Sequence, residues 1–317
     1  MGSAVTDVQP DSRLIAIDAM PERPDKPEEA CGVFAVLAQG QPVANLTYFG
    51  LYALQHRGQE SAGIAVFDAA HKVRLHKDMG LVSQVFDQSV LERLPGQLAI
   101  GHNRYSTTGS SKACNAQPVL LNTRLGPLAF AHNGNLVNAG ELREAIAADI
   151  PEVEFTSTTD SELIAFAIQH AVNQGLGWDA AIREAASRCR GAFSLVIGTP
   201  EGLFALRDGH GIRPLVFGHM GEISEAQWVV SSETCGLDII GASFDGDVDE
   251  LEELIGLLSG KFDFNHAAGA SETTGCSSTA ATGVSALTSG GSTCGSIGGT
   301  IITGGNHGSG GAMTGGL

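Results

Sequence analysis

A change in composition near residue 265 limits how much of this chain can fold. From Asn265 to the C-terminus the sequence consists mainly of Gly, Ser, Thr and Ala, with Glu272 as its single charged residue and no aromatic residue. Such a segment has little apolar surface to offset an ordering entropy of about 1–2 kcal/mol per residue. Its glycines follow no three-residue period, which excludes a collagen helix. We therefore predict that residues 263–317 are a disordered low-complexity tail, or a frameshifted segment.

The rest of the chain divides at Cys31. Prolines at positions 10, 21, 24 and 27 interrupt any helix in residues 1–30, and acidic residues gather at positions 25, 28 and 29. We predict that 1–30 is a leader or propeptide, with an ordinary flexible terminus as the alternative. Residues 31–262 carry apolar side chains at strand and helix spacing, and we predict that they form one globular domain.

Charge and cysteine content exclude several classes of protein. The 317 residues carry a formal net charge of -17, which argues against nucleic acid or an anionic membrane as partner. No apolar run approaches the ~20 residues of a membrane helix. The six cysteines are widely spread and form no CxxC pair, which is typical of a reducing compartment. We predict a cytoplasmic protein.

The pattern of apolar residues predicts an α+β fold. Several successive strands have no helix between them, so antiparallel hairpins outnumber βαβ crossovers and helices cover antiparallel sheet. The predicted strands are 31–37, 62–67, 98–105, 119–122, 128–132, 192–198, 202–207 and 228–231, and the predicted helices are 45–56, 83–94, 139–148, 160–173 and 178–189.

Cys31 is the first candidate for chemistry. A lone cysteine that opens an apolar strand is most often a buried structural residue. If the leader is removed after Ala30, however, Cys31 carries a free α-amino group with a pKa of about 7.7–8.0. An amine that titrates near neutrality beside a thiol is a built-in general base, as in N-terminal nucleophile enzymes. Gly32 would leave room for a substrate carbonyl.

Three further motifs supply polar groups at the ends of predicted elements. Arg104 ends a strand and can bind a carboxylate through two hydrogen bonds, although it could be a surface arginine. Asn133 and Gly134 provide the two donors of an oxyanion hole, or form a hairpin turn. Asp160 could bind an ammonium group; in the alternative, Asp160 or Ser161 simply caps the following helix. Together these groups suit an α-amino acid with a side-chain amide.

Five motifs, taken in order, closely resemble the glutaminase domain of the glutamine phosphoribosylpyrophosphate amidotransferase family, within the class II glutamine amidotransferases. They are CGVF at 31, QHRGQESAG at 55, GHNRYSTTG at 101, HNGNL at 132 and TSTTDSE at 156. Three more extend the resemblance to about residue 248: GAFSLV at 191, RDGHGIRPLVFG at 207 and SSETCGLDIIGA at 231. QHRGQESAG and GIRPL favour this family over glucosamine-6-phosphate synthase, which stays as the alternative.

The resemblance implies a fold and a reaction. The fold is the four-layer αββα sandwich of N-terminal nucleophile (Ntn) hydrolases, and the reaction releases ammonia from L-glutamine through a cysteinyl thioester, for the first committed step of purine synthesis. The implied roles are the nucleophile for Cys31, α-carboxylate binding for Arg104 and Thr107, α-ammonium binding for Asp160, and oxyanion stabilisation for Asn133 and Gly134.

Cofactors are implied only for full-length family members, which use Mg2+ and, in one branch, a [4Fe-4S] cluster. Cys235 matches a ligand position of that cluster, which needs four thiolates. The other ligands belong to a region that this sequence lacks, and Cys276 and Cys294 in the tail have neither the spacing nor the context to replace them. We therefore expect no metal or other cofactor in this chain, and leave a homo-oligomer open.

The resemblance ends before a second domain. After Gly241 we find no strand with paired acidic residues and a Gly/Thr loop, as a phosphoribosyltransferase domain requires. Three hypotheses follow: the glutamine-hydrolysing half of the family enzyme, a folded but inactive glutamine-binding remnant, or another amide hydrolase whose substrate lacks the amino-acid head group. Arg104 and Asp160 argue against the third, because they provide for both ends of an amino acid.

Overall fold

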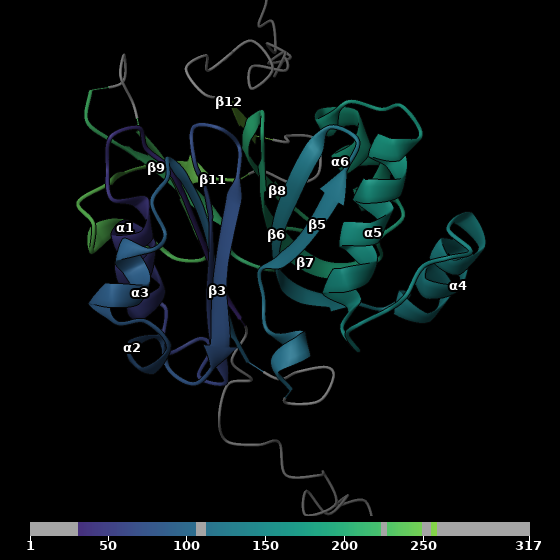
Figure 1. Ribbon diagram of the computed structural model, residues 1–317, viewed down its shortest axis with the longest axis horizontal. Coiled ribbons are helices and arrows are strands. Elements are labelled where there is room, and N and C mark those ends of the chain that lie inside the picture. Colours follow the sequence, from purple (N-terminus) through teal and green to yellow (C-terminus); the bar gives the residue numbers. More distant parts are fainter. Residues whose placement is uncertain (1–30, 106–111, 223–226, 249–254, 259–317) are drawn as a thin grey trace, which may run out of the picture. The chain divides into compact units, whose positions relative to one another are not determined.

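Two antiparallel β-sheets lie face to face, with helices on the outer side of each (Figure 1). The computed structural model describes residues 31–105, 112–222, 227–248 and 255–258. The predicted leader 1–30, the tail 263–317 and Thr107 lie outside the described residues.

The first sheet has seven strands in the order β11-β9-β10-β1-β4-β2-β3. Their bounds are β1 Gly32–Leu37, β2 Ser61–Phe67, β3 Val73–Met79, β4 Leu98–Arg104, β9 Val216–Met220, β10 Gln227–Ser231 and β11 Ser243–Asp247. The second sheet has five strands in the order β12-β8-β7-β6-β5. Their bounds are β5 Val119–Thr123, β6 Gly126–Leu136, β7 Gly191–Thr199, β8 Gly202–Arg207 and β12 Ile255–Leu258.

The central strand β1 explains why its sequence is a continuous apolar run. Its side chains alternate between the two sides of the sheet, and both sides are buried. Phe34 and Val36 pack towards the helices, whereas Val33 and Ala35 pack against the second sheet. A strand buried on both faces needs apolar residues at every position.

The outer layers are helical. The seven-stranded sheet is covered by α1 (Val43–Ala53), α2 (Val82–Val85), α3 (Gln88–Glu92) and α7 (Thr234–Asp238). The five-stranded sheet packs against α4 (Ala139–Asp149), α5 (Asp160–Asn173) and α6 (Trp178–Ser187). The four-layer αββα arrangement is therefore confirmed (Figure 1).

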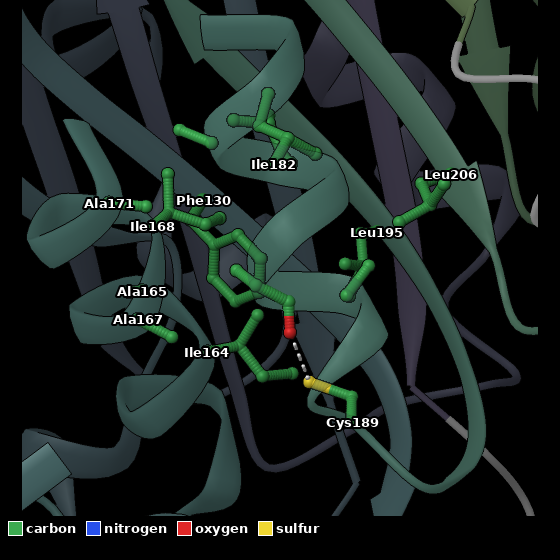
Figure 2. Packing of buried hydrophobic residues seen from close by; sticks show 14 of the residues in the cluster. Phe130, Ile164, Ala165, Ala167, Ile168, Ala171, Ile182, Cys189, Leu195 and Leu206 are labelled. Carbon is green, nitrogen blue, oxygen red and sulfur yellow. Dashed lines mark hydrogen bonds between the residues drawn. The ribbon is translucent and has the colours of Figure 1, made fainter. Parts of the chain in front are cut away.

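The helical layer on the five-stranded sheet is closely packed. Figure 2 shows Phe130 of β6 among the apolar side chains of α5, including Ile164 and Ile168. Cys189 lies buried in the same cluster, where its thiol donates to the carbonyl oxygen of Ala185 at 3.2 Å. Burial raises the pKa of Cys189 to about 12, so this thiol is a structural residue.

Several boundaries differ from the sequence prediction. Strands β3, β9, β11 and β12, helix α7 and the short 3-10 helix η2 (Ala113–Asn115) were not predicted. The single helix expected over 83–94 is two short helices, because Asp87 caps the second one and accepts a hydrogen bond from the backbone N–H of Val90 at 2.8 Å. Among the described helices, none is both long and apolar enough to cross a membrane.

Candidate active site

Strand register places Cys31 beside Arg104. Gly32 pairs with Asn103 of β4, so the residue before β1 lies next to the C-terminal end of β4. The sulfur of Cys31 is 3.4 Å from the backbone nitrogen of Tyr105, whose N–H donates to it, and 3.5 Å from the carbonyl oxygen of the same residue. The thiol is half-buried.

The surroundings of Cys31 keep its thiol protonated in the chain as it stands. Burial raises the pKa of the Cys31 thiol, and the negative charge of Asp160 adds to this effect. The Tyr105 N–H and the positive charge of Arg104 act in the opposite direction without cancelling it. Nucleophilic attack by this sulfur therefore requires a base that removes its proton.

A small cavity opens in front of the sulfur. Residues from five segments line it, among them Cys31, Arg104, Gly134 and Asp160. Its volume of about 20 Å³ is enough for one water molecule but not for an amino acid, so a substrate of that size has to displace part of the lining. The structure brings these four predicted site residues together.

Arg104 is a buried ion-pair partner. Its side chain is 3% exposed, and its guanidinium donates to the carboxylate of Glu60, which directly precedes β2. The backbone N–H of Glu60 also donates to the Arg104 carbonyl oxygen at 3.0 Å. The alternative of a surface arginine is wrong, because a buried guanidinium needs this compensating charge.

Asp160 points away from its own helix terminus. The N-cap of α5 is Thr159, which makes no side-chain capping bond. The Asp160 carboxylate instead accepts the backbone N–H of Leu136 at 2.8 Å and lies 3.6 Å from Nδ1 of His132. The carboxylate therefore faces the end of β6 and the cavity, and the alternative of a simple capping role is wrong.

The Asn133-Gly134 pair lies inside a strand. Asn133 pairs with Ser194 and Gly134 with Phe193 of β7, so the alternative of a hairpin turn is wrong. Gly134 has φ +145°, a conformation that favours glycine, and a Cβ atom at this position would overlap the carbonyl oxygen of Ala192. Glycine at this position therefore allows β6 to pair closely with β7 where it passes the cavity.

The side chain of Asn133 is fully buried and unpaired. It is 0% exposed, and neither its amide nitrogen nor its amide oxygen has a hydrogen-bond partner within the described part of the chain. Asn133 is not among the residues that line the cavity, although the adjacent Gly134 is. An unpaired buried amide is costly, and it leaves a donor available to a ligand group.

Gly32 has a different role from the one expected. A Cβ atom at this position would lie 3.1 Å from Cβ of Leu54, directly after α1. The space beside Gly32 is therefore filled by close packing between strand and helix, and it is not open to a substrate.

Sequence reasoning missed a second arginine at the site. Nε of Arg57 donates to the carbonyl oxygen of Cys31 at 3.1 Å, and its guanidinium pairs with Glu233. His56 Nε2 also lies 3.0 Å from the Glu233 carboxylate. Burial raises the pKa of Glu233, but the hydrogen bonds and charges of Arg57 and His56 outweigh it and lower the pKa overall. The sequence signal that could have identified these residues is the pair of motifs that contain them, QHRGQESAG and SSETCG.

The described residues do not fit an iron–sulfur cluster at Cys235. Its sulfur lies 3.8 Å from both a Glu233 carboxylate oxygen and the Ala53 carbonyl oxygen. Over residues 31–105, 112–222 and 227–248, no group of three or more His, Cys, Asp or Glu side chains could hold a metal ion. A [4Fe-4S] cluster needs four thiolates, and the described residues do not bring four cysteines together at Cys235.

Comparison with known proteins shows that the chain is similar to glutamine amidotransferases. A family model described as a glutamine amidotransferase domain matches residues 102–238. The amidophosphoribosyltransferase of Synechococcus elongatus is 64% identical over 227 residues, which cover 72% of this chain and 45% of that protein. The Mycobacterium tuberculosis amidophosphoribosyltransferase is 47% identical over 258 residues, which cover 79% of this chain and 47% of that protein.

Solved structures show the same relationship. The glutamine phosphoribosylpyrophosphate amidotransferase of B. subtilis, solved with ADP and GMP, matches with a TM-score of 0.62 and 36% identity. That match covers 69% of this chain and 46% of the other. The chain thus spans less than half the length of these relatives.

Proposed function

The chain carries the glutamine amidotransferase domain of the amidophosphoribosyltransferase family, and on this basis we propose that it hydrolyses the side-chain amide of L-glutamine with Cys31 as nucleophile. One observation carries the proposal. A single cavity is lined by a thiol, a guanidinium, a glycine backbone and a carboxylate, from Cys31, Arg104, Gly134 and Asp160. These groups complement the reacting amide and both charged ends of an α-amino acid.

Arg104 and Asp160 would bind the substrate backbone. The guanidinium of Arg104 has five N–H donors, and it can hold the α-carboxylate of glutamine while it keeps its contact with Glu60. The Asp160 carboxylate accepts one backbone N–H and has acceptor capacity for the α-ammonium group. Thr107 is assigned to the same carboxylate-binding role by the resemblance alone.

The chemical step needs a base for the Cys31 thiol, whose pKa is raised in the intact chain. Removal of residues 1–30 would create an α-amino group on Cys31 that accepts this proton. The thiolate then attacks the amide carbon, the C–N bond breaks, and the ammonium passes its proton to the leaving nitrogen, which departs as ammonia. Water hydrolyses the thioester, which releases glutamate and restores the thiol.

Asn133 and Gly134 would stabilise the tetrahedral intermediate. An oxyanion hole needs two donors close to the position where negative charge develops. The Gly134 backbone borders the cavity, and the unpaired amide of Asn133 is the second donor once it turns towards the substrate. Loss of one such donor typically lowers kcat about 10²–10³-fold.

Transfer of the ammonia to phosphoribosyl pyrophosphate, in purine synthesis, is the activity that the relatives' names imply for a longer protein. Because this chain matches less than half of each relative, we propose only the glutamine-hydrolysing half-reaction for the chain alone.

Glutamate release from glutamine by the purified full chain tests the proposal. Intact-mass measurement should show a species that begins at Cys31, and the Cys31→Ala variant should release no glutamate. The matched control is Cys114→Ala, which removes an exposed thiol and should keep wild-type activity. The same assay with asparagine in place of glutamine tests whether the site requires the longer side chain of glutamine.

Two outcomes would contradict this function. Glutamate release by Cys31→Ala would remove the nucleophile from its role. An absence of release by wild-type protein that begins at Cys31, together with measurable glutamine binding, would favour the folded but inactive remnant.

A further inference from the structure

We propose that His102 and Gln117 are positioning residues that hold the peptide of His132, and so fix the oxyanion-binding part of β6 relative to the nucleophile. The inference rests on the proposed function, because it assigns a role to these side chains in amide hydrolysis. Both residues act through the backbone of His132, and neither touches the reacting atoms.

His102 makes a hydrogen bond from one sheet to the other. It belongs to β4 of the seven-stranded sheet, two residues before Arg104, and its side chain is 0% exposed. Its Nε2 atom lies 3.1 Å from the carbonyl oxygen of His132, which belongs to β6 of the five-stranded sheet. A carbonyl oxygen only accepts, so Nε2 must carry the hydrogen. This bond links the strand of Arg104 to the strand of Asn133 and Gly134.

Gln117 holds the same residue from the other side. Its Oε1 accepts the backbone N–H of His132 at 2.8 Å, and its Nε2 lies 3.3 Å from the His132 carbonyl oxygen. Two side chains therefore hold both polar atoms of one backbone residue. Lys77 secures the chain on either side of Gln117, because its ammonium donates to the carbonyl oxygens of Ala116 at 2.6 Å and Pro118 at 3.1 Å.

The side chain of His132 extends this network to α5. Its Nδ1 atom lies 3.0 Å from Ser161 Oγ and 3.6 Å from an Asp160 carboxylate oxygen. Gln117 Nε2 also donates to Ser161 Oγ at 3.0 Å. His132 thus connects β4, the segment before β5, and the start of α5, which together with β6 surround the cavity. Asn133 follows His132 directly in the sequence.

The arrangement suits positioning and not proton transfer. Burial lowers the pKa of His102 to about 3, so its ring stays neutral at physiological pH and Nε2 remains a fixed donor. Catalytic groups lose about 10²-fold in rate when they are displaced by about 1 Å. Without the cross-sheet bond, the strand that carries the oxyanion donors can shift relative to Arg104 and Cys31.

Kinetics of glutamate release by the full chain test this inference. We expect His102→Leu to lower kcat about 10–100-fold and to change KM for glutamine less than about 3-fold, because the oxyanion interaction exists only in the transition state. His102→Gln retains a nitrogen donor near the position of Nε2 and should recover most of the lost kcat. The matched control is His76→Leu, since His76 Nε2 also bonds a backbone carbonyl, that of Val85 at 3.2 Å. It should keep wild-type kcat and KM.

Folding is measured in parallel by urea denaturation, and kcat is expressed per folded molecule. If His102→Leu does not fold, Gln117→Glu tests the same peptide, since it keeps the acceptor for the His132 N–H but loses the donor. It should show the same fall in kcat. The pH–rate profiles of wild type and His102→Gln should coincide, whereas loss of a limb in the variant would make His102 an acid–base group.

Wild-type kcat in His102→Leu, or equal loss in His102→Gln and His102→Leu, would overturn the inference while leaving the proposed function intact. A wild-type chain that begins at Cys31 and releases no glutamate would refute the proposed function and the inference together. The two failures are therefore distinguishable.

Discussion

At the scale of single residues, the cavity beside Cys31 contains a buried carboxylate, that of Asp160, which has few hydrogen-bond donors of its own. Asp160 is buried at the start of α5, yet among the described residues its carboxylate has one close donor, the Leu136 N–H at 2.8 Å, with His132 Nδ1 further away at 3.6 Å. A buried carboxylate gains from a charged partner, and an ammonium group supplies both a charge and hydrogen bonds.

Asp160→Asn is expected to weaken glutamine binding. The variant keeps an oxygen that can accept the Leu136 N–H, so the start of α5 should stay in place. A hydrogen bond to a charged group contributes about 1.5–3 kcal/mol, which predicts a rise of about 10–100-fold in KM. We expect kcat to change much less, since the ammonium group is bound equally in substrate and transition state.

Steady-state kinetics with glutamine measure this effect. Asp87→Asn is the matched control, because the Asp87 carboxylate also accepts a backbone N–H but caps α3. Unchanged KM in Asp160→Asn would refute the assignment of the ammonium-binding carboxylate.

The buried His102 also predicts how stability depends on pH. Burial lowers its pKa from an ordinary value of 6.5 to about 3, with the nearby charges of Arg104 and Lys77 acting in the same direction. Below pH 6.5 the unfolded chain therefore binds a proton at His102, whereas the folded chain does not. The contribution of His102 to the free energy of unfolding is fully present above pH 6.5 and decreases as the pH falls towards 3. About one pH unit below the unfolded value, His102 should account for a loss of about 1.4 kcal/mol.

Urea denaturation at neutral pH and at about pH 5.5 measures this loss. His102→Gln has no titrating group at this position, so its stability should decrease by about 1.4 kcal/mol less than that of wild type over the same range. Burial also lowers the pKa of His132, whose contribution should persist in the variant. Equal pH dependence in both proteins would contradict the assignment.

At the scale of elements, β6 depends on one glycine. Gly134→Ala should destabilise the fold by about 2 kcal/mol or more, because φ is +145° and the new methyl group would overlap the Ala192 carbonyl oxygen of β7. Gly140→Ala is the opposite case, since α4 leaves open space around this position. It should stabilise the chain by about 0.5–1 kcal/mol. Urea denaturation of both variants checks the contrast, and an undiminished stability of Gly134→Ala would show that β7 moves aside easily.

Several of the elements that the sequence predicted are buried on both sides or long enough to show a period. Strand β1 and helix α5 are of this kind. Strand β3 was missed because it lies at the edge of the sheet, is half-buried, and carries charged residues within VRLHKDM. Strand β11 is mostly exposed and irregular in register near Gly246, so its sequence SFDGD has neither apolar alternation nor length. Edge strands depend on their neighbours, which a local pattern does not contain.

The site was predictable where a residue type carries the chemistry, and not where tertiary contacts decide its role. Cys31, Arg104, Gly134 and Asp160 were named from their chemistry, and they meet at one cavity. The local signal of Asn133-Gly134 favoured a turn, but pairing with β7 overrides it. The roles of His102 and Gln117 cannot be deduced from a local pattern, because their shared partner is the backbone of His132, 30 and 15 residues away in the sequence.

At the scale of the whole molecule, the two sheets make the site possible. Cys31 directly precedes β1 and Arg104 ends β4 of one sheet, while Gly134 belongs to β6 of the other. The apolar contact between the sheets, formed by residues such as Val33, Ile100 and Ala131, holds these two groups at a fixed separation. A substitution that loosens the packing between the sheets should therefore change the distance from Cys31 and Arg104 to Gly134.

A pair of truncations tests which part of the chain this packing needs. Within the described part of the chain, the three apolar clusters consist of residues between 33 and 248, so a chain that ends after Lys261 keeps them, together with β12. Its free energy of unfolding should lie within about 1 kcal/mol of the full chain. A chain that ends after Val248 lacks β12 and leaves β8, which pairs with it from Gly202 to Ala205, as an uncovered edge. Loss of several ladder hydrogen bonds should cost about 2–4 kcal/mol and promote association through that edge. Urea denaturation and light scattering separate the two, and a large loss already in the longer truncation would show that residues beyond 261 pack against the sheets.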